Sequence, residues 1–474
     1  MENQELAAAK SSKKGFLDPI IALFWWSWRR LERTILLGIK IVFPSRFISP
    51  LGFLGMLTLV VFIILGVTGA VLMFHFEPAF GDCSQGNPQT CNIAFESVGR
   101  ITNDVGWGFM MRNIHYHASN AMVLLAVMHM FYQYFSGRYK LRYEMLWITG
   151  VILGVVTVIE AYTGYDLIFN IRGTLAINIG QTLTFYSPVI GADLARIIFG
   201  FSFNDLALRF YAFHVFIVPI IMLAIMAVHL PRNLVLDIPV SSAITGIIFI
   251  MGGLFPVEVG IKYDPGALTE ITFPEWYFTS LYSFIRVRGL DPFFAGGIIP
   301  AIFIVIFLVV PIFDRGKKIA MIDRPFWIAL GVAALGQIAI VTVWGFRADN
   351  PFLPLTAPNQ LVIDSLLFWG SILIASALAY GSVYSYVRWR RAKVEQMRAN
   401  RQPIPIRKVK PYLFSKGEVY SMLGGLLVLQ AFLDLAIFRA VLSELNNFVL
   451  IEIGLVLVAF AATAHIYRVT SQAK

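Results

Sequence analysis

Ten apolar stretches of the sequence are each long enough to cross a membrane, and no other feature constrains the fold as strongly. A hydrocarbon core of about 30 Å needs about 20 mostly apolar residues in a helix. The stretches lie at 51–76, 111–135, 146–165, 210–230, 242–259, 293–313, 325–344, 361–387, 419–438 and 448–466. Charged residues make up 14% of the chain, against about 25% in soluble domains. We therefore predict an all-α integral membrane protein with about ten transmembrane helices, which excludes a soluble enzyme.

The basic residues are unevenly distributed between alternate loops. An even number of crossings puts both termini on one side, and that side holds 28 of the 38 Lys and Arg residues. Because cytoplasmic loops carry the excess of basic residues, we expect a multi-pass plasma-membrane protein with both termini in the cytoplasm. The net charge of +10 then orients the chain in its lipid membrane, and we expect no nucleic-acid partner.

Two segments on this side of the membrane are not predicted to span it. The cytoplasmic tail at 1–50 contains a tryptophan- and arginine-rich stretch at 20–42, which is typical of an amphipathic interfacial helix. A disordered basic tail is the alternative. Residues 391–418 are basic and proline-containing and are interpreted as a linker to an additional two-helix hairpin at 419–474. We expect this hairpin to dock another subunit or lipid.

The two cysteines, Cys83 and Cys91, both fall in the first loop on the opposite side. A disulfide between them suits an oxidising exterior, and two unpaired thiols are the alternative. Neither cysteine belongs to the CxxCH pattern that attaches haem covalently.

Four histidines lie within two apolar stretches, where ionisable side chains are usually functional. The second stretch contains His115 and His129, and the fourth contains His214 and His229. Separations of 14 and 15 residues bring each pair back to nearly the same helix face, about 21 Å apart along the axis. Because the two helices run parallel, His115 should lie level with His214, and His129 with His229. Two imidazoles at each of two levels predict two non-covalent haems; hydrogen-bonded core histidines are the alternative, and zinc would need more ligands at one point.

Glycines on the first and third stretches repeat the histidine spacing, which would let a flat haem approach the backbone. They are Gly55, Gly69, Gly150 and Gly164. Small-residue helix packing is the alternative explanation. Arg112 and Arg209 lie near the outer histidines and are candidates for pairing with haem propionates, although arginines near helix ends also extend to the interface.

Three motifs together resemble cytochrome b of the quinol-oxidising Rieske/cytochrome b complexes. They are GWGFMMRNIH with a second histidine 14 residues on, RFYAFH with one 15 residues on, and FPEWYF at 273–278. The resemblance covers about residues 45–390. It implies a four-helix di-haem bundle at 51–235, followed by a C-terminal helical half at 236–390. It also implies an outer haem on His115 and His214 and an inner haem on His129 and His229, with haem b or an a-type variant.

The same resemblance implies a quinol oxidoreductase. The outer quinol site would contain Pro274, Glu275, Trp276 and Tyr277, with Glu275 as proton acceptor and Tyr277 as a supporting hydrogen-bonding group. One electron would pass to a separate Rieske iron–sulfur protein and the other through both haems to an inner quinone site, for which Arg232 is a candidate. A downstream cytochrome, copper protein or terminal oxidase, and a dimer or supercomplex, are the further implied partners. We also predict a short non-spanning helix at 273–285, with Pro274 in its first turn.

Several features leave other interpretations open. A haem b membrane anchor of a dehydrogenase or reductase also binds haem through histidine pairs, and a proton-coupled transporter would use intramembrane histidines without haem. After Gly164-Tyr165 this sequence has Asp166, which departs from the family's pattern. We therefore expect the wall of the outer pocket to differ from that of the family. Glu160 is an unusual acid within a helix, either a proton relay or a neutral hydrogen-bonded group. His117 should face away from the haem.

Overall fold

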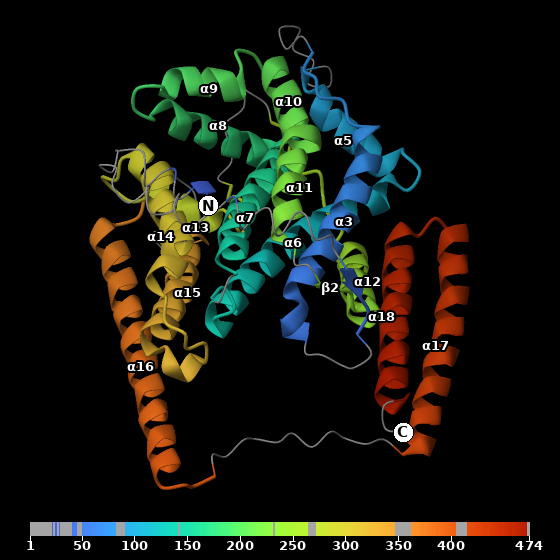
Figure 1. Ribbon diagram of the computed structural model, residues 1–474. Helices are drawn as coiled ribbons and strands as arrows, with labels where there is room; N and C mark the ends of the chain where they lie inside the picture. Colours follow the sequence, from blue (N-terminus) through green and yellow to red (C-terminus); the bar gives the residue numbers. More distant parts are fainter. Residues whose placement is uncertain are drawn as a thin grey trace, which may run out of the picture.

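The computed structural model describes residues 21, 24–25, 28, 40–44, 50–81, 91–140, 143–230, 233–263, 272–346, 362–403 and 415–471. Most of these residues are helical (Figure 1). The α-helices are α3 (Leu54–Met73), α5 (Ile93–Asn103), α6 (Gly108–Ser136), α7 (Glu144–Asp166), α8 (Ile171–Phe185), α9 (Gly191–Phe199), α10 (Phe203–Ala212), α11 (Val218–His229), α12 (Ile238–Leu254), α13 (Thr279–Ile285), α14 (Ile299–Phe313), α15 (Pro325–Phe346), α16 (Ser365–Ala399), α17 (Lys416–Leu442) and α18 (Asn446–Ser471). Short elements are the 3-10 helices η1 (Pro50–Phe53) and η5 (Met321–Asp323), the π-helical turns η3 (Phe213–Ile217) and η4 (Phe294–Ile298), and the strands β1 (Lys40–Val42) and β2 (Asn233–Val235).

Eight stretches of the described chain are long and apolar enough to span a membrane. They are Leu51–Met73, Glu144–Asp166, Phe203–His229, Phe294–Phe313, Pro325–Phe346, Ser365–Ala399, Lys416–Leu442 and Asn446–Thr470. The other two predicted crossings are also helices: α6 has 29 residues and carries several polar side chains, and α12 has 17 residues. The predicted all-α multi-pass membrane fold is therefore confirmed.

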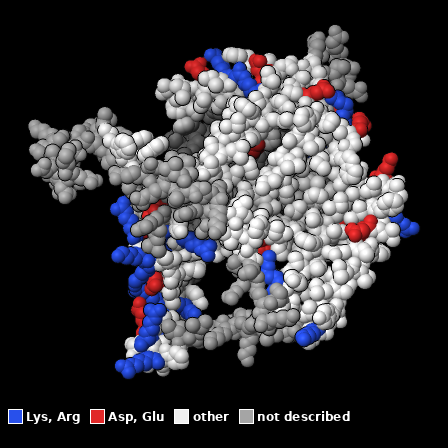
Figure 2. Space-filling view, turned by 45° about the vertical axis from the view of Figure 1, so that its right-hand side comes forward, with Lys and Arg blue, Asp and Glu red and all other residues white. Residues whose placement is uncertain are grey.

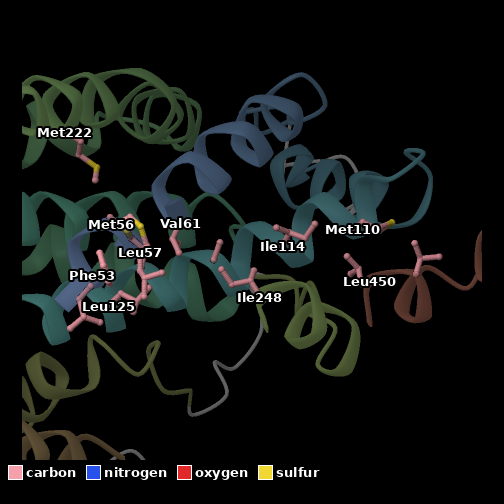
Figure 3. Close-up of a cluster of buried hydrophobic side chains, with 14 of the residues drawn as sticks. Phe53, Met56, Leu57, Val61, Met110, Ile114, Leu125, Met222, Ile248 and Leu450 are labelled. Carbon is pink, nitrogen blue, oxygen red and sulfur yellow. The ribbon is translucent and has the colours of Figure 1, made fainter. Parts of the chain in front are cut away.

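The first half of the chain forms a bundle of α3, α6, α7 and the continuous run α10–η3–α11 (Figure 1). A cluster of buried apolar side chains joins α3, α6 and their neighbours α11, α12 and α18 (Figure 3). Met56 and Val61 of α3, Ile114 of α6 and Ile248 of α12 are all at most 4% exposed. Because these side chains interlock, α3 and α6 are held at a fixed register, which matters for the residues between them.

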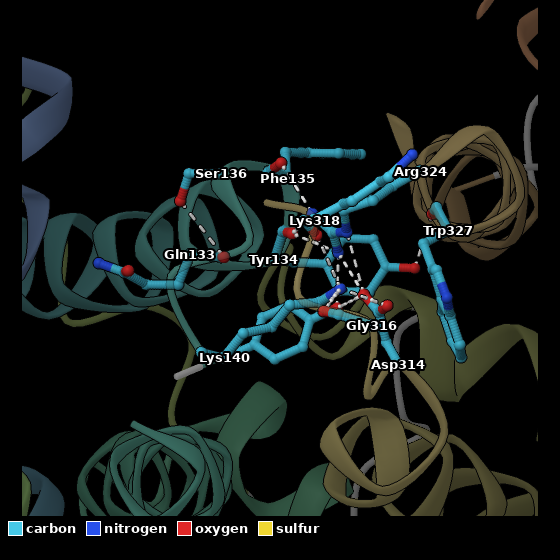
Figure 4. A network of polar contacts seen from close by, with 11 residues as sticks. Gln133, Tyr134, Phe135, Ser136, Lys140, Asp314, Gly316, Lys318, Arg324 and Trp327 are labelled. Atoms are coloured by element: carbon cyan, nitrogen blue, oxygen red, sulfur yellow. Dashed lines mark hydrogen bonds and ion pairs between the residues drawn. The ribbon is translucent and has the colours of Figure 1, made fainter. Parts of the chain in front are cut away.

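A buried polar network joins this bundle to the C-terminal half (Figure 4). Lys140 Nζ lies 2.5 Å from Asp314 Oδ1, and Arg324 Nη2 lies 2.8 Å from Asp314 Oδ2. Tyr139 donates its hydroxyl proton to Asp314 Oδ2, and Arg324 also reaches the carbonyl of Tyr134. One buried carboxylate thus pairs with two cations from different segments, which satisfies all three charges. The network fixes the end of α6 to the loop between α14 and α15.

The C-terminal hairpin packs on the bundle of its own chain. Helix α18 lies against α12, where Gly246 and Gly454 allow close backbone approach. At one end of this contact, Arg468 Nη1 lies 2.7 Å from Asp237 Oδ2, and Asp237 also caps α12 by accepting a hydrogen bond from Val240 N. This contact within the chain was not predicted, and the docking of the hairpin to another subunit or lipid stays a prediction. Helix α17, on the far side of α18 (Figure 1), exposes a row of large apolar side chains.

Two local predictions differ from the structure, and a third falls partly outside the described residues. Residues 40–42 form strand β1, which pairs in parallel with β2, so a helix does not extend to residue 42. Helix α16 continues to Ala399, so the first residues of the predicted linker at 391–418 are helical. Cys91 is disulfide-bonded, whereas its predicted partner Cys83 lies outside the described residues.

The charged side chains on the surface are unevenly distributed along the direction of the helices. Figure 2 shows basic side chains gathered towards the lower end of the molecule, below a broad region with few charges. The last turns of α16 contribute the exposed Arg388, Arg390, Lys393 and Arg398. A region with few charges between charged ends suits a protein that crosses a lipid bilayer several times.

Candidate functional site

The four histidines of the bundle form two pairs at two heights. The ring centres of His115 and His214 are 6.2 Å apart with their planes at 84°, and those of His129 and His229 are 6.3 Å apart at 87°. We call His115 and His214 the outer pair, because they lie towards the end of the bundle that carries α8 and α9, and His129 and His229 the inner pair. The structure thus brings together the same two residues at each level that the helix spacing predicts.

A π-helical turn explains why separations of 14 and 15 residues reach the same heights. The turn η3 contains His214, and Val218 N donates to the carbonyl of Phe213, five residues back. Such a turn accommodates one extra residue without rotating the rest of the helix by a full step. Pro219 follows at once and has no N–H to donate, so an α-helical bond is unavailable there. The extra residue between His214 and His229 is therefore absorbed beside His214.

Each imidazole lies against one of the four predicted glycines. A Cβ atom added at Gly55 would lie 2.8 Å from Cε1 of His129, and one at Gly69 would lie 3.2 Å from Cε1 of His115. On α7, the same atom at Gly150 would lie 2.8 Å from Cε1 of His229, and Gly164 faces His214 more closely still. Any larger side chain would push the ring away, so these glycines set the positions of the imidazoles.

Threonines hold the Nδ1 atoms of three of the four imidazoles. Nδ1 of His115 lies 2.9 Å from Thr68 Oγ1. The same atom lies 3.2 Å from Thr149 Oγ1 in the case of His229, and 3.3 Å from Thr163 Oγ1 in the case of His214. The Thr68 hydroxyl donates to the carbonyl of Ile64, so its oxygen accepts from the ring. Nδ1 of His129 has no hydrogen-bond partner in the part of the chain that the structure describes. Protonation at Nδ1 leaves the Nε2 lone pair available as a metal ligand.

These distances fit a pair of imidazoles on opposite sides of one metal atom. Two bonds of about 2.0 Å, each with a ring centre about 1.1 Å beyond the nitrogen, give a separation of about 6 Å. Both pairs have this separation, and each imidazole lies against a glycine that leaves room for the ring. The residues present therefore fit one axially bound haem at each level.

A cavity of about 500 Å³ lies next to Tyr116 and His117, which follow His115 on α6. Tyr116, Arg172, Phe255 and Thr272 are among the residues that line it. Two of them reach Glu275, which is 9% exposed: Arg172 Nη1 lies 3.2 Å from its Oε1, and the Tyr116 hydroxyl lies 3.3 Å from its Oε2. A buried carboxylate is thus held at the edge of the cavity by a cation and a phenol.

The segment around Glu275 differs in conformation from the prediction. Helix α13 begins at Thr279, so Pro274 precedes the helix and does not lie in its first turn. Trp276 Nε1 donates to Asn120 Oδ1 at 2.6 Å, which ties the segment to α6. Burial, together with the nearby Glu275, raises the pKa of Tyr277 well above its usual value, so its hydroxyl stays protonated. Tyr277 can therefore act as a hydrogen-bond donor beside Glu275.

The predicted arginines have other partners in the structure. Arg112 donates to the carbonyls of Val257 and Glu258, which anchors one wall of the cavity. Arg209 donates to the carbonyls of Arg196 and Ile197. Their roles toward haem propionates stay predictions. Arg232 lies outside the described residues.

His117 is not part of either pair. Its Nε2 lies 2.8 Å from the carbonyl of Phe255, and it lines the cavity.

Several polar residues at the site were missed from the sequence. The three threonines each precede a glycine within an apolar helix, and this Thr-Gly repeat was a readable signal. Arg172 and Tyr116 had no such signal, because only the folded chain brings them to Glu275. Asp166 is fully buried, and neither carboxyl oxygen has a hydrogen-bond partner among the described residues.

Two sequence families match the chain in succession. The family described as "Cytochrome b/b6/petB" matches residues 40–234, and that described as "Cytochrome b(C-terminal)/b6/petD" matches residues 264–362. The first match contains all four histidines, and the second contains Glu275. The residues beyond 362, including α17 and α18, lie outside both matches.

Individual relatives agree with these matches. The chain is 35% identical over 178 residues to a protein of Rippkaea orientalis named "Cytochrome b6", covering 37% of this chain and 75% of the relative. A "Cytochrome b6" of Acaryochloris marina is 33% identical over 178 residues, with 37% and 78% covered. Among solved structures, a chain of "Hyperthermophilic respiratory Complex III" is similar in fold, with a TM-score of 0.53 and 19% identity over 78% of this chain and 98% of that chain.

Proposed function

Because the chain belongs to the cytochrome b/b6 family, we propose that it is the quinol-oxidising membrane subunit of a bc-type complex with two haems. The observation that carries this proposal is the geometry of the two histidine pairs, with ring centres 6.2 and 6.3 Å apart and a glycine behind each ring. A haem b membrane anchor also binds haem through histidine pairs but would lack the FPEWYF segment at 273–278. A transporter without haem would not require a glycine against each ring.

His115 and His214 would hold the outer haem, and His129 and His229 the inner haem. When bound, the haems would supply one-electron carriers that connect the two faces of the membrane. The protein's part is to keep Nε2 of each ring directed at the haem position. Hydrogen bonds from Nδ1 to Thr68, Thr149 and Thr163 fix three of the rings in that orientation.

The cavity near Tyr116 and Arg172 would bind the quinol head group, and Glu275 would accept one of its protons. Quinol oxidation releases two protons with two electrons, so a carboxylate at the reaction site serves as a general base. Arg172 stabilises the charged carboxylate, and Tyr116 donates a hydrogen bond to it. The protonated Tyr277 would supply a further hydrogen bond to the quinol or to Glu275.

The remaining components follow from the proposed chemistry. A separate Rieske iron–sulfur protein would take one electron from the quinol and pass it to a downstream cytochrome, copper protein or terminal oxidase. An inner quinone would take the other electron. We also propose that the protein lies in the plasma membrane with both termini in the cytoplasm, and that it works as a dimer or within a supercomplex.

Membranes containing the full chain and its partner subunits test this proposal in two steps. Reduced-minus-oxidised spectra should show two haems per chain; a colourless protein would contradict the proposal. Glu275→Gln should then slow quinol oxidation by about 10²–10⁴-fold, the usual contribution of a positioned base, with haem content unchanged. Glu77→Gln is a matched control, because Glu77 lies on the same side with 59% of its side chain exposed. Equal rates in both variants would remove Glu275 from the proton path.

A further inference from the structure

The four glycines that face the imidazoles occupy equivalent positions in two helices, so their neighbours can be compared directly. The residue immediately before the glycine is threonine at three positions: Thr68, Thr149 and Thr163. The residue four before the glycine has its carbonyl near the imidazole, as seen for Leu65 with His115, Leu146 with His229 and Glu160 with His214. At the fourth glycine, Gly55, the equivalent residue is Leu51.

One of these equivalent positions carries an acid where the other three carry leucine. Glu160 Oε1 lies 3.2 Å from Nδ1 of His214, in addition to its carbonyl at 3.1 Å. The side chain of Glu160 is 21% exposed, and its other oxygen, Oε2, has no hydrogen-bond partner among the described residues. The carboxyl group is therefore directed at one imidazole and at no other described group.

A carboxyl group behind an axial histidine changes the strength of that ligand. When Nδ1–H donates to a carboxylate, the ring gains imidazolate character, and Nε2 becomes a more basic donor to the metal. A more basic donor stabilises the oxidised metal more than the reduced one, which lowers the reduction potential. Threonine and backbone oxygens, the partners of His115 and His229, are neutral acceptors and have a smaller effect.

We propose that Glu160 is a positioning residue that lowers the reduction potential of the outer haem through the contact between its carboxyl group and Nδ1 of His214. The inference rests on the proposed binding of haem by the outer pair. It assigns to Glu160 a different role from a proton relay, because its contact is with the haem ligand. One acid on one of four equivalent positions makes the two haem sites chemically unequal.

Redox titration of the full chain in membranes, with both haems resolved by their spectra, tests the inference. Glu160→Leu copies the other three positions and should favour reduction of the outer haem about tenfold, a rise of about 59 mV for one electron. Glu160→Gln keeps an acceptor without the charge and should give a smaller rise. The inner haem should not change in either variant.

The reciprocal variant places the acid at the inner level. Leu146→Glu puts a carboxyl group at the position equivalent to Glu160, facing His229, and should lower the potential of the inner haem alone. Unchanged outer potentials in both Glu160 variants, with two haems present, would overturn the inference and leave the proposed function standing. A wild-type chain without haem would overturn both. A fall of the inner potential in Leu146→Glu would support the inference even if Glu160→Leu failed to assemble.

Discussion

At the outer level both imidazoles donate Nδ1–H to protein oxygens, whereas at the inner level His229 does so and His129 does not. His214 has three oxygens within 3.3 Å of Nδ1, two from Glu160 and one from Thr163. Nδ1 of His129 has no such partner in the described chain, and the residue before its glycine, Leu54, cannot supply one. Two sites with nearly the same ring separation thus differ in how firmly each ring is oriented. If the chain binds haem as proposed, the bundle geometry would set where each haem binds, and the Nδ1 partners would set its properties.

Removing one of the four proposed haem ligands should give the largest difference between the inner and outer levels. His129→Leu should abolish the inner haem and leave the outer one, because His229 would be the one described histidine left at that level. Haem content should fall from two to one per chain, and the reduced-minus-oxidised spectrum should lose one component. His117→Leu, which changes a histidine on the same helix, should retain both haems. Two haem signals in His129→Leu would show that the ligand pairing is wrong.

A side chain at one of the glycines should weaken one level selectively. Gly164→Val places methyl groups against His214 and should lower outer haem occupancy, while Gly150→Val should do the same to the inner haem. Overpacking typically costs 1–3 kcal/mol, which is about five- to 150-fold in occupancy. Gly154→Val is the control on the same helix, because a Cβ there meets no atom within 4 Å. Equal haem loss in all three variants would indicate general damage to α7.

The hairpin contact lies next to the inner level, and breaking it should destabilise the chain. The backbone N–H of Asp237 contacts Met56, which follows Gly55, the glycine against His129. Arg468→Gln leaves Asp237 buried without its cation and should lower the free energy of unfolding by on the order of 1–3 kcal/mol. The thermal midpoint of the purified protein measures this. Arg390→Gln, at an exposed position of α16, should leave the midpoint unchanged.

Substitution of the threonines should have the smallest effects, and each substitution should change the reduction potential at one level only. Thr68→Val and Thr149→Val each remove one acceptor from Nδ1, which is worth about 0.5–1.5 kcal/mol, or about two- to tenfold in the reduction equilibrium. The potential should rise at the outer haem in the first variant and at the inner haem in the second. Thr163→Val should change little, because Glu160 still provides two oxygens to His214. A larger shift in Thr163→Val than in Thr68→Val would contradict this ranking.

The helices and the two histidine levels were predictable because both depend on periodicity along one segment. Apolar length identified ten helices, and a fixed rotation per residue aligned His115 with His129. The π turn at His214 was not predicted. A constant rotation of about 100° per residue places His229 about 60° past the helix face of His214, and it takes no account of the missing N–H of Pro219. The position of Pro274 before α13 was also misjudged, since Trp276 is held by Asn120 of a distant helix.

Contacts between distant segments were the part that sequence patterns could not supply. Arg172 reaches Glu275 only because α8 folds back over the outer end of the bundle. Arg468 reaches Asp237 across more than two hundred residues of chain, and neither position shows a spacing that connects them. Glu160 was recognised as unusual, but its partner followed only from the close approach of α7 to His214.

The π turn beside His214 also has a consequence for how such chains diverge. A residue gained in a continuous α-helix rotates everything after it by about 100°, which would turn His229 out of the bundle. Here the added residue bulges out within Phe213–Ile217, and the helix resumes its phase by His229. One residue can therefore be gained or lost at this point without moving His229 off the face that it shares with His214, so spacings of 14 and 15 residues are compatible with the same arrangement in space.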